Sequence, residues 1–161
     1  MLDINQYIIY VIEPTLNKLD MWSNEAEELI LGTALVESRL SYLHQVDGPA
    51  IGLLQMELPT AMDILRRYVA QKDRHFRIRV ENACMIMAPW DLSDEGIQNH
   101  LQINLAMQVA LARLKYWMVE EPIPVELGAM AEYWKDYYNT NKGHGHPKMF
   151  IREWRENVER T

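Results

Sequence analysis

The residue best suited to chemistry is Glu37, a carboxylic acid on a helical stripe that is otherwise free of charge. Helical spacing places it on one face with Ala26, Ile30, Thr33 and Leu40. An unpaired carboxylate on a core-facing stripe costs on the order of several kcal/mol, so the protonated form is favoured and the pKa is raised. A carboxyl group that stays protonated near neutral pH can serve as a general acid, as the cleavage of a glycosidic bond requires.

Two structural interpretations of Glu37 stay open at this point. It lies at the edge of the stripe, or a buried arginine pairs with it, because helical phase alone does not decide the environment of one side chain. The loop that follows, residues 44–52, adds two features that suit a site. Gly52 is suited to positive φ or to close approach of another group. The amide of Gln55 needs hydrogen-bond partners among apolar neighbours, and a sugar hydroxyl or N-acetyl group is one candidate.

The elements that must position these residues are helical throughout, and no segment alternates with strand periodicity. The predicted helices are 4–12, 24–40, 58–68, 75–87, one long helix from Ser93 to Trp117, 125–138 and 147–159. Pro14 bends or ends the first helix, a capping box of Asn24 and Glu27 opens the second, and Pro59 starts the third. Pro89 ends the fourth. The prediction is a mainly α, compact single domain over residues 1–161, in which residues 1–22 form an N-terminal helical extension.

The net charge and the cysteine count limit the kinds of partner and of structural bond that the chain can have. The chain has 161 residues, 16 basic and 23 acidic side chains and a net charge of −7. An acidic chain lacks the basic footprint of nucleic-acid binding, so no nucleic-acid partner is expected. The single cysteine, Cys84, cannot form an internal disulfide and is predicted to be a core thiol. Residues 66–79 are the exception, with six basic side chains and one acidic. They are interpreted as a solvated helix face, with an anionic ligand or DNA as the alternatives.

No targeting segment or membrane span is expected. Residues 1–20 lack a basic start, and acids interrupt their apolar run, unlike a secretory signal peptide. No run of about 18 apolar residues occurs. The pair His144 and His146 has no third ligand at a diagnostic spacing, so it is interpreted as a loop and no metal is expected. The aromatic residues Tyr133, Trp134, Tyr137 and Tyr138 suit either a sugar-binding groove or helix packing, and Trp134 is assigned to the core.

Three motifs, in this order, resemble those of lytic transglycosylases, the SLT-type branch of the lysozyme-like superfamily. The first is Glu37-Ser38 at a helix end. The second runs from Gly48 to Met56 and is followed by Pro59-Thr60-Ala61, and the third is Tyr138-Asn139 followed by Gly143. The helix start Asn104-Leu105 is a further parallel. Over residues 24–154 the chain resembles small bacteriophage proteins of this group, which share the segments Gly48 to Glu57 and Tyr133 to Thr140.

The resemblance implies an enzyme that cleaves the MurNAc–GlcNAc β-1,4 bond of peptidoglycan. Glu37 would act first as acid and then as base, the substrate's N-acetyl group would assist, and the product would be a 1,6-anhydro sugar without a metal or cofactor. The implied substrate-binding residues are Ser38, Gln55, Met56, Tyr138 and Asn139. Among them, Ser38 would orient Glu37 or contact sugar, and Tyr138 would hydrogen-bond Glu37 or the substrate. Residues 137–143 are bulkier than the family's alanine-rich ending, which predicts a narrower groove.

Two alternatives stay open: a hydrolase in place of a transglycosylase, and a structural protein in place of an enzyme. A hydrolase needs a second carboxylate, for which Asp47 and Glu57 are the candidates, although a structural role is favoured for each. The alternative class is a structural virion protein that keeps the lysozyme-like fold with little or no activity. Other virion proteins are then possible partners. Either class predicts a protein located in the phage virion, or in the host cytoplasm before release, and the enzyme would act on the cell wall.

Overall fold

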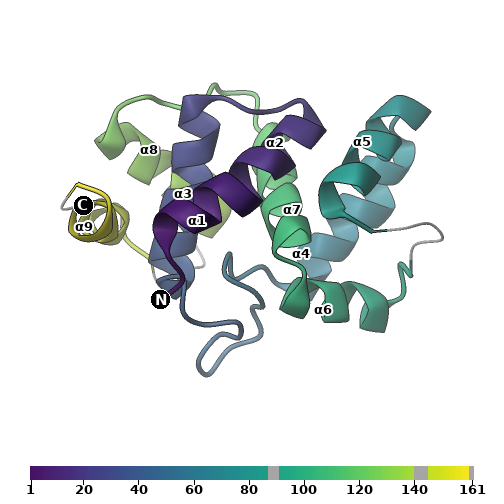
Figure 1. Ribbon diagram of the computed structural model, residues 1–161, viewed down its shortest axis with the longest axis horizontal. Helices are drawn as coiled ribbons and strands as arrows, with labels where there is room; N and C mark the ends of the chain where they lie inside the picture. The colour runs from purple at the N-terminus through teal and green to yellow at the C-terminus, as the bar shows by residue number, and fades with distance from the viewer. Residues whose placement is uncertain (87–90, 140–144, 160–161) are drawn as a thin grey trace.

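The helix that carries Glu37, α3 (Asn24–Ser38), lies inside the molecule with other helices on several sides (Figure 1). The structure is a computed structural model that describes residues 1–86, 91–139 and 145–159. The remaining elements are α1 (Ile4–Tyr7), η1 (Ile8–Ile12), α2 (Glu13–Leu19), α4 (Leu58–Asp63), η2 (Ile64–Tyr68), η3 (Val69–Gln71), α5 (Arg74–Cys84), α6 (Asp94–Ile103), α7 (Leu105–Trp117), α8 (Leu127–Trp134), η4 (Lys135–Asn139) and α9 (Pro147–Asn157). The described residues form one compact, mainly helical domain without strands, as predicted.

The N-terminal helical segment runs past Pro14 instead of ending there. The π-helical turn η1 directly precedes α2, and Pro14 falls in the first turn of α2. A proline has no backbone N–H to donate, and a wider π turn before it accommodates that loss. Tyr7, Ile12 and Leu16 from this segment are almost fully buried. The helices within residues 1–22 therefore form part of the hydrophobic core.

Helix α3 begins and ends differently from the predicted span 24–40. Its N-cap is Ser23, not Asn24, because the Ser23 hydroxyl accepts a hydrogen bond from the backbone N–H of Ala26 at 3.1 Å. The helix ends at Ser38 because Arg39 and Leu40 have left-handed φ values of 53° and 50°. Glu37 is thus in the last turn of α3, next to the loop that follows it.

The single long helix predicted from Ser93 to Trp117 is wrong, because the chain breaks at Asn104. A helix does start at Asn104-Leu105, as the resemblance implied. Ser93 caps α6 as expected, but Asn104 has an extended backbone and caps α7 by accepting from the N–H of Met107 at 2.9 Å. Its amide also donates to the carbonyl of Cys84 at 2.8 Å, which joins the end of α5 to the start of α7. Helix α7 is buried on several sides, as its two apolar faces predicted.

The remaining predicted helices are present with shifted ends. Pro59 lies in the first turn of α4 as expected, and Pro147 starts α9. Helix α5 ends at Cys84, where Met85 has a φ of 53°, so it stops before Pro89, which lies outside the described residues. Cys84 is fully buried, which confirms the predicted core thiol. In the described part of the chain, no helix is both long and apolar enough to cross a membrane.

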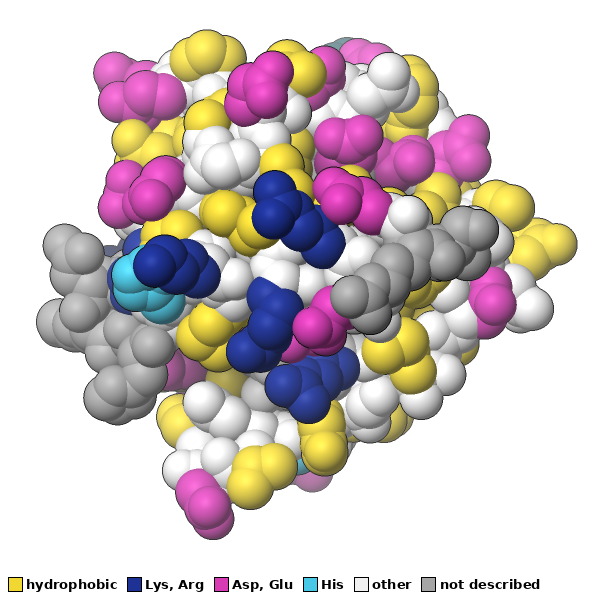
Figure 2. Space-filling view, turned by 90° about the vertical axis from the view of Figure 1, so that its left-hand side faces the viewer, with side chains coloured by type: hydrophobic (Ala, Val, Ile, Leu, Met, Phe, Trp, Pro, Cys, Tyr) yellow, Lys and Arg dark blue, Asp and Glu magenta, His cyan; other side chains and the backbone are white. Residues whose placement is uncertain are grey.

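The charged groups are distributed unevenly over the surface. Within residues 66–79, three arginines pair with acids at 2.8–3.2 Å: Arg66 with Asp94, Arg67 with Asp63, and Arg79 with Asp20. This agrees with a solvated helix face. Figure 2 shows a second gathering of Lys and Arg side chains on the side of the molecule where α9 lies, among acidic groups. Lys148, Arg152 and Arg155 of α9 line one hollow there.

Candidate active site

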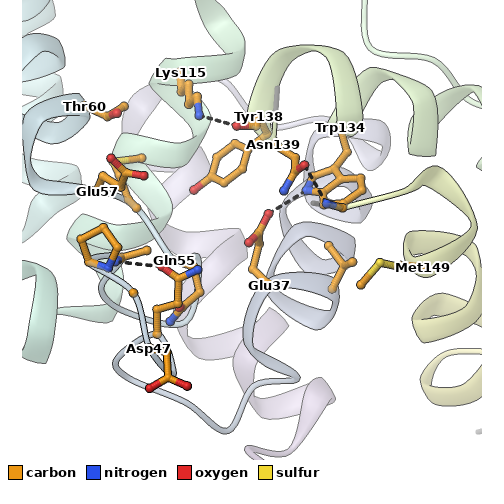
Figure 3. Close-up of a pocket in the computed structure, with 17 residues that line it drawn as sticks. Glu37, Asp47, Gln55, Glu57, Thr60, Lys115, Trp134, Tyr138, Asn139 and Met149 are labelled. Atoms are coloured by element: carbon orange, nitrogen blue, oxygen red, sulfur yellow. Dashed lines mark hydrogen bonds between the residues drawn. The ribbon is translucent and has the colours of Figure 1, made fainter. Parts of the chain in front are cut away.

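A cavity of about 660 Å³ opens beside the end of α3 and brings together residues from distant parts of the sequence (Figure 3). Five of the six site residues expected from the sequence line it: Glu37, Gln55, Met56, Tyr138 and Asn139. The sixth, Ser38, does not. Other lining residues include Asp47, Glu57, Thr60, Lys115, Trp134 and Met149. The cavity thus has walls from α3, the 39–57 loop, α4, α7, α8, η4 and the start of α9.

Glu37 is partly buried at this cavity, and its pKa is raised to about 7. Burial is the main cause, because a charged carboxylate loses hydration there. Four groups act in the opposite direction by favouring the carboxylate: hydrogen bonds from the side chains of Trp134 and Asn139, and the positive charges of Lys115 and Lys135. The raised pKa agrees with the prediction from helical phase. Among the described residues no arginine pairs with Glu37, so the buried-arginine interpretation is wrong.

Trp134 holds the Glu37 carboxyl group in place. Its indole Nε1 donates a hydrogen bond to Oε1 of Glu37 at 3.1 Å, and its side chain is almost fully buried. The ring packs against Phe150 of α9 with centroids 5.9 Å apart. Phe150 in turn lies so close to Gly32 of α3 that a Cβ there would be 2.1 Å from the ring. Trp134 therefore belongs to the core, as predicted, and also to the site.

Replacing Trp134 with phenylalanine is expected to remove the hydrogen bond while keeping most of the aromatic packing. Since that bond favours the Glu37 carboxylate, the pKa of Glu37 should rise above about 7. We expect roughly a tenfold loss of any Glu37-dependent activity, because an unheld carboxyl group is less well oriented. A ¹³C NMR titration of the Glu37 carboxyl carbon measures the first effect. An unchanged pKa in a folded Trp134→Phe protein would show that the indole does not stabilise the carboxylate.

The loop between α3 and α4 is shaped by one glycine and one buried glutamine. Gly52 has a φ of 80°, and a Cβ on it would lie 2.5 Å from the Gln108 side chain. Gln108 accepts from the N–H of Leu53 at 2.9 Å and donates to the carbonyl of Leu101 at 2.7 Å. Both requirements expected for Gly52, positive φ and close approach, are therefore met. The contact fixes the loop against α7.

In the described part of the chain, the hydroxyl groups of Ser38 and Tyr138 bond to the same loop and not to Glu37. The buried hydroxyl of Ser38 lies 2.7 Å from the carbonyl of Leu53 and 3.1 Å from that of Ala34. The expected role of Ser38 in orienting Glu37 or contacting sugar is not supported by this placement. Tyr138 was expected to hydrogen-bond Glu37 or the substrate, but its hydroxyl donates to the carbonyl of Leu54 at 2.8 Å. Both groups hold the wall that faces Glu37.

The two amides of the expected site are placed differently. Gln55 has a φ of 45°, and its Nε2 donates to the carbonyl of Gly52 at 2.7 Å, so its own loop supplies a partner. No described residue donates a hydrogen bond to its Oε1. Asn139 accepts at Oδ1 from Nζ of Lys135 at 2.9 Å and from the N–H of Gly145 at 3.2 Å, and its side chain also bonds to Glu37. Asn139 is thus a direct neighbour of the candidate acid.

Both candidates for a second carboxylate line the cavity. Asp47 and Glu57 are exposed, and Figure 3 places Glu57 across the cavity from Glu37. Glu57 occupies the N-cap position of α4, yet its side chain makes no capping hydrogen bond. The carboxylate of Glu57 therefore takes no part in capping α4 and is available to the cavity.

Sequence reasoning missed Lys115, which lines the cavity from α7. Its Nζ donates to the carbonyl of Tyr138 at 2.7 Å and lies 4.1 Å from the centre of the Tyr138 ring. Burial lowers its pKa, while the charges of Glu37 and Glu57 act in the other direction. The signal was present, because Lys115 interrupts the apolar run of a buried helix just as Glu37 does.

The other motifs do not extend the site. Tyr133 and Tyr137 pack edge to face with centroids 4.7 Å apart, and the Tyr133 hydroxyl donates to the carbonyl of Glu121 at 3.0 Å. Nδ1 of His146 accepts from the N–H of Lys148 and caps α9, whereas His144 lies outside the described residues, as do Thr140 to Gly143. Within the described ranges, no three potential metal ligands cluster.

Comparisons with known proteins add no relative. No family model matches the sequence, and no curated protein or solved structure is similar enough to count as a match. Function is therefore inferred from the residues of the cavity and from their motifs.

Proposed function

We propose that this protein is a peptidoglycan-cleaving lytic transglycosylase with an SLT-type, lysozyme-like domain. The observation that carries the proposal is the meeting of Glu37, Gln55 and the Tyr138-Asn139 pair around one cavity, although about 100 residues of sequence separate the first from the last. Those are the residues of the three ordered motifs. The raised pKa of Glu37 supplies the chemistry that such an enzyme needs.

In the proposed reaction, Glu37 acts twice. Protonated Glu37 donates its proton to the glycosidic oxygen between MurNAc and GlcNAc, and the C1–O bond breaks as the N-acetyl group of the substrate assists. The Glu37 carboxylate then takes the proton from the 6-hydroxyl of MurNAc, whose oxygen forms a bond to C1. The product is a 1,6-anhydro sugar, and Glu37 regains its proton. Trp134 and Asn139 donate hydrogen bonds that stabilise the carboxylate between the two steps.

A hydrolase is the second outcome that the cavity allows. Asp47 and Glu57 line the same cavity, and either could activate water instead of the 6-hydroxyl. Such an enzyme would yield reducing ends. The one-carboxylate mechanism is preferred because the resemblance to transglycosylases implies that no second carboxylate is needed.

The test is to digest purified peptidoglycan and identify the products by mass spectrometry. We expect anhydro-muropeptides from the wild-type protein and none from Glu37→Gln. Products with reducing ends would show that the protein is a hydrolase and not a transglycosylase. No release of fragments by a folded protein would contradict an enzyme and favour the structural virion protein. The same assay on whole phage particles would test the expected location in the virion.

A further inference from the structure

The cation at the cavity, Lys115, is held rigidly but is not neutralised by a partner. Its ammonium group bonds to the Tyr138 carbonyl at 2.7 Å and sits 4.1 Å from the centre of the Tyr138 ring. No ion pair joins Lys115 to a carboxylate in the part of the chain that the structure describes. A partly buried charge without an adjacent counter-charge acts over a longer range, since little water screens it.

The charges that face this cation are the carboxyl groups at the cavity. Glu37 from α3 and Glu57 at the start of α4 both act on Lys115, with Glu37 the stronger influence. In return, Lys115 favours the carboxylate of Glu37 more than Lys135 does. Tyr138 and Tyr116 are buried next to the site and stay neutral, because burial raises the pKa of each phenol. Asp47 is exposed on the loop wall.

We propose that Lys115 is a positioning residue whose ammonium charge stabilises the ionised form of Glu37 across the cavity. Its role for catalysis rests on the proposed function. Glu37 must give up a proton and then hold a negative charge until it removes the next proton. A cation fixed by Tyr138 lowers the energy of the Glu37 carboxylate between the two proton transfers. It does so without forming a direct ion pair, which would block the carboxylate oxygens. Glu37 thus remains free to exchange its proton with the substrate.

The test separates the charge of Lys115 from its hydrogen bond. Lys115→Gln keeps a donor for the Tyr138 carbonyl but has no charge, Lys115→Met has neither, and Lys115→Arg keeps both. The pKa of Glu37 is measured in each protein by a ¹³C NMR titration of its carboxyl carbon, which is assigned by its absence in Glu37→Gln. We expect the pKa to rise by about 1 in the Gln and Met variants and to stay unchanged in the Arg variant.

Two results would overturn the proposal. One is a Glu37 pKa that is the same in all folded variants. The other is a pKa that changes only in Lys115→Met, which would assign the effect to the hydrogen bond. If the Met variant does not fold, the Gln and Arg pair decides alone. Lys72→Gln is the matched control, because Lys72 also lies over a tyrosine ring, 4.3 Å from that of Tyr68, but does not line the cavity.

The titration stays informative even if the protein cleaves nothing. A failure to release muropeptides contradicts the proposed function, whereas the Glu37 pKa still reports on Lys115. If cleavage is observed, the pH above which kcat falls should move upward in Lys115→Gln by the same amount as the Glu37 pKa. An unmoved kcat profile beside a moved pKa would contradict a role for Lys115 in the reaction.

Discussion

Replacing Glu37 with glutamine is expected to lower peptidoglycan cleavage by roughly 10³-fold or more while leaving the helical fold intact. Glutamine has nearly the same shape and can accept the hydrogen bond from Trp134, but it cannot donate and recover a proton. Cleavage is measured as muropeptide release, and folding by circular dichroism. Glu28→Gln is the matched control, because Glu28 is an exposed acid on the same helix. Undiminished release by Glu37→Gln would remove Glu37 from the mechanism.

The same substitution should change stability with a definite dependence on pH. The pKa of Glu37 is about 7 in the folded protein, against an ordinary value of 4.5. Between these values the folded protein keeps a proton that the unfolded chain has lost, so stability falls as the pH rises through this window. Glutamine carries no such charge. We therefore expect Glu37→Gln to be more stable than the wild type at pH 8, and the difference to shrink towards pH 4.

Wild-type activity should follow the protonated form of Glu37. The rate is expected to decline above about pH 7, where the general acid is increasingly lost. Urea denaturation at several pH values and the pH profile of muropeptide release thus report the same ionisation in two ways. A stability difference that does not vary with pH would contradict the raised pKa.

The largest expected effect on stability comes from Gly32→Ala. An added Cβ would lie 2.1 Å from the tip of the Phe150 ring, and both residues are buried between α3 and α9. Alanine is otherwise better than glycine in a helix, so the clash has to outweigh a gain of up to about 1 kcal/mol. We expect a net loss of about 2 kcal/mol in the free energy of unfolding, measured with urea. Activity should also fall, because Phe150 packs against Trp134, which holds Glu37.

Two further variants isolate the clash. Gly128→Ala, in α8, is the matched control, because a Cβ there meets nothing within 4 Å and should be neutral or slightly stabilising. In the Gly32→Ala background, Phe150→Leu shortens the side chain at the point of contact and should restore part of the lost stability. A Gly32→Ala protein as stable as the wild type would show that α9 moves aside at little cost.

The sequence was most informative where one residue broke a regular pattern. Glu37 interrupts an apolar stripe, and its raised pKa follows from burial alone. Gly52 between two apolar segments likewise indicated a constrained turn. Periodicity did not reveal the break at Asn104, because the apolar faces of α6 and α7 continue across it and only the capping side chain ends the first helix.

Hydrogen bonds to the backbone were the least predictable part of the site. Ser38 and Tyr138 were assigned to Glu37 or the substrate from their motifs, yet both bond to carbonyls of the following loop. A side-chain hydroxyl carries no sign in the sequence of which distant carbonyl it will meet. For Lys115 the break in the apolar run was visible in the sequence, but its partner, the carbonyl of Tyr138, was not.

Three side chains form hydrogen bonds with the backbone of Leu53 and Leu54. Ser38 bonds to the carbonyl of Leu53, Gln108 to its N–H, and Tyr138 to the carbonyl of Leu54. These three side chains come from α3, α7 and η4, so one short stretch of loop can take its shape only after all three have docked. A partly folded chain has Glu37 but not the wall opposite it. The wall opposite Glu37 is therefore a product of the whole tertiary structure, and we expect a variant that loses any one of these three hydrogen bonds to have a less well-defined cavity.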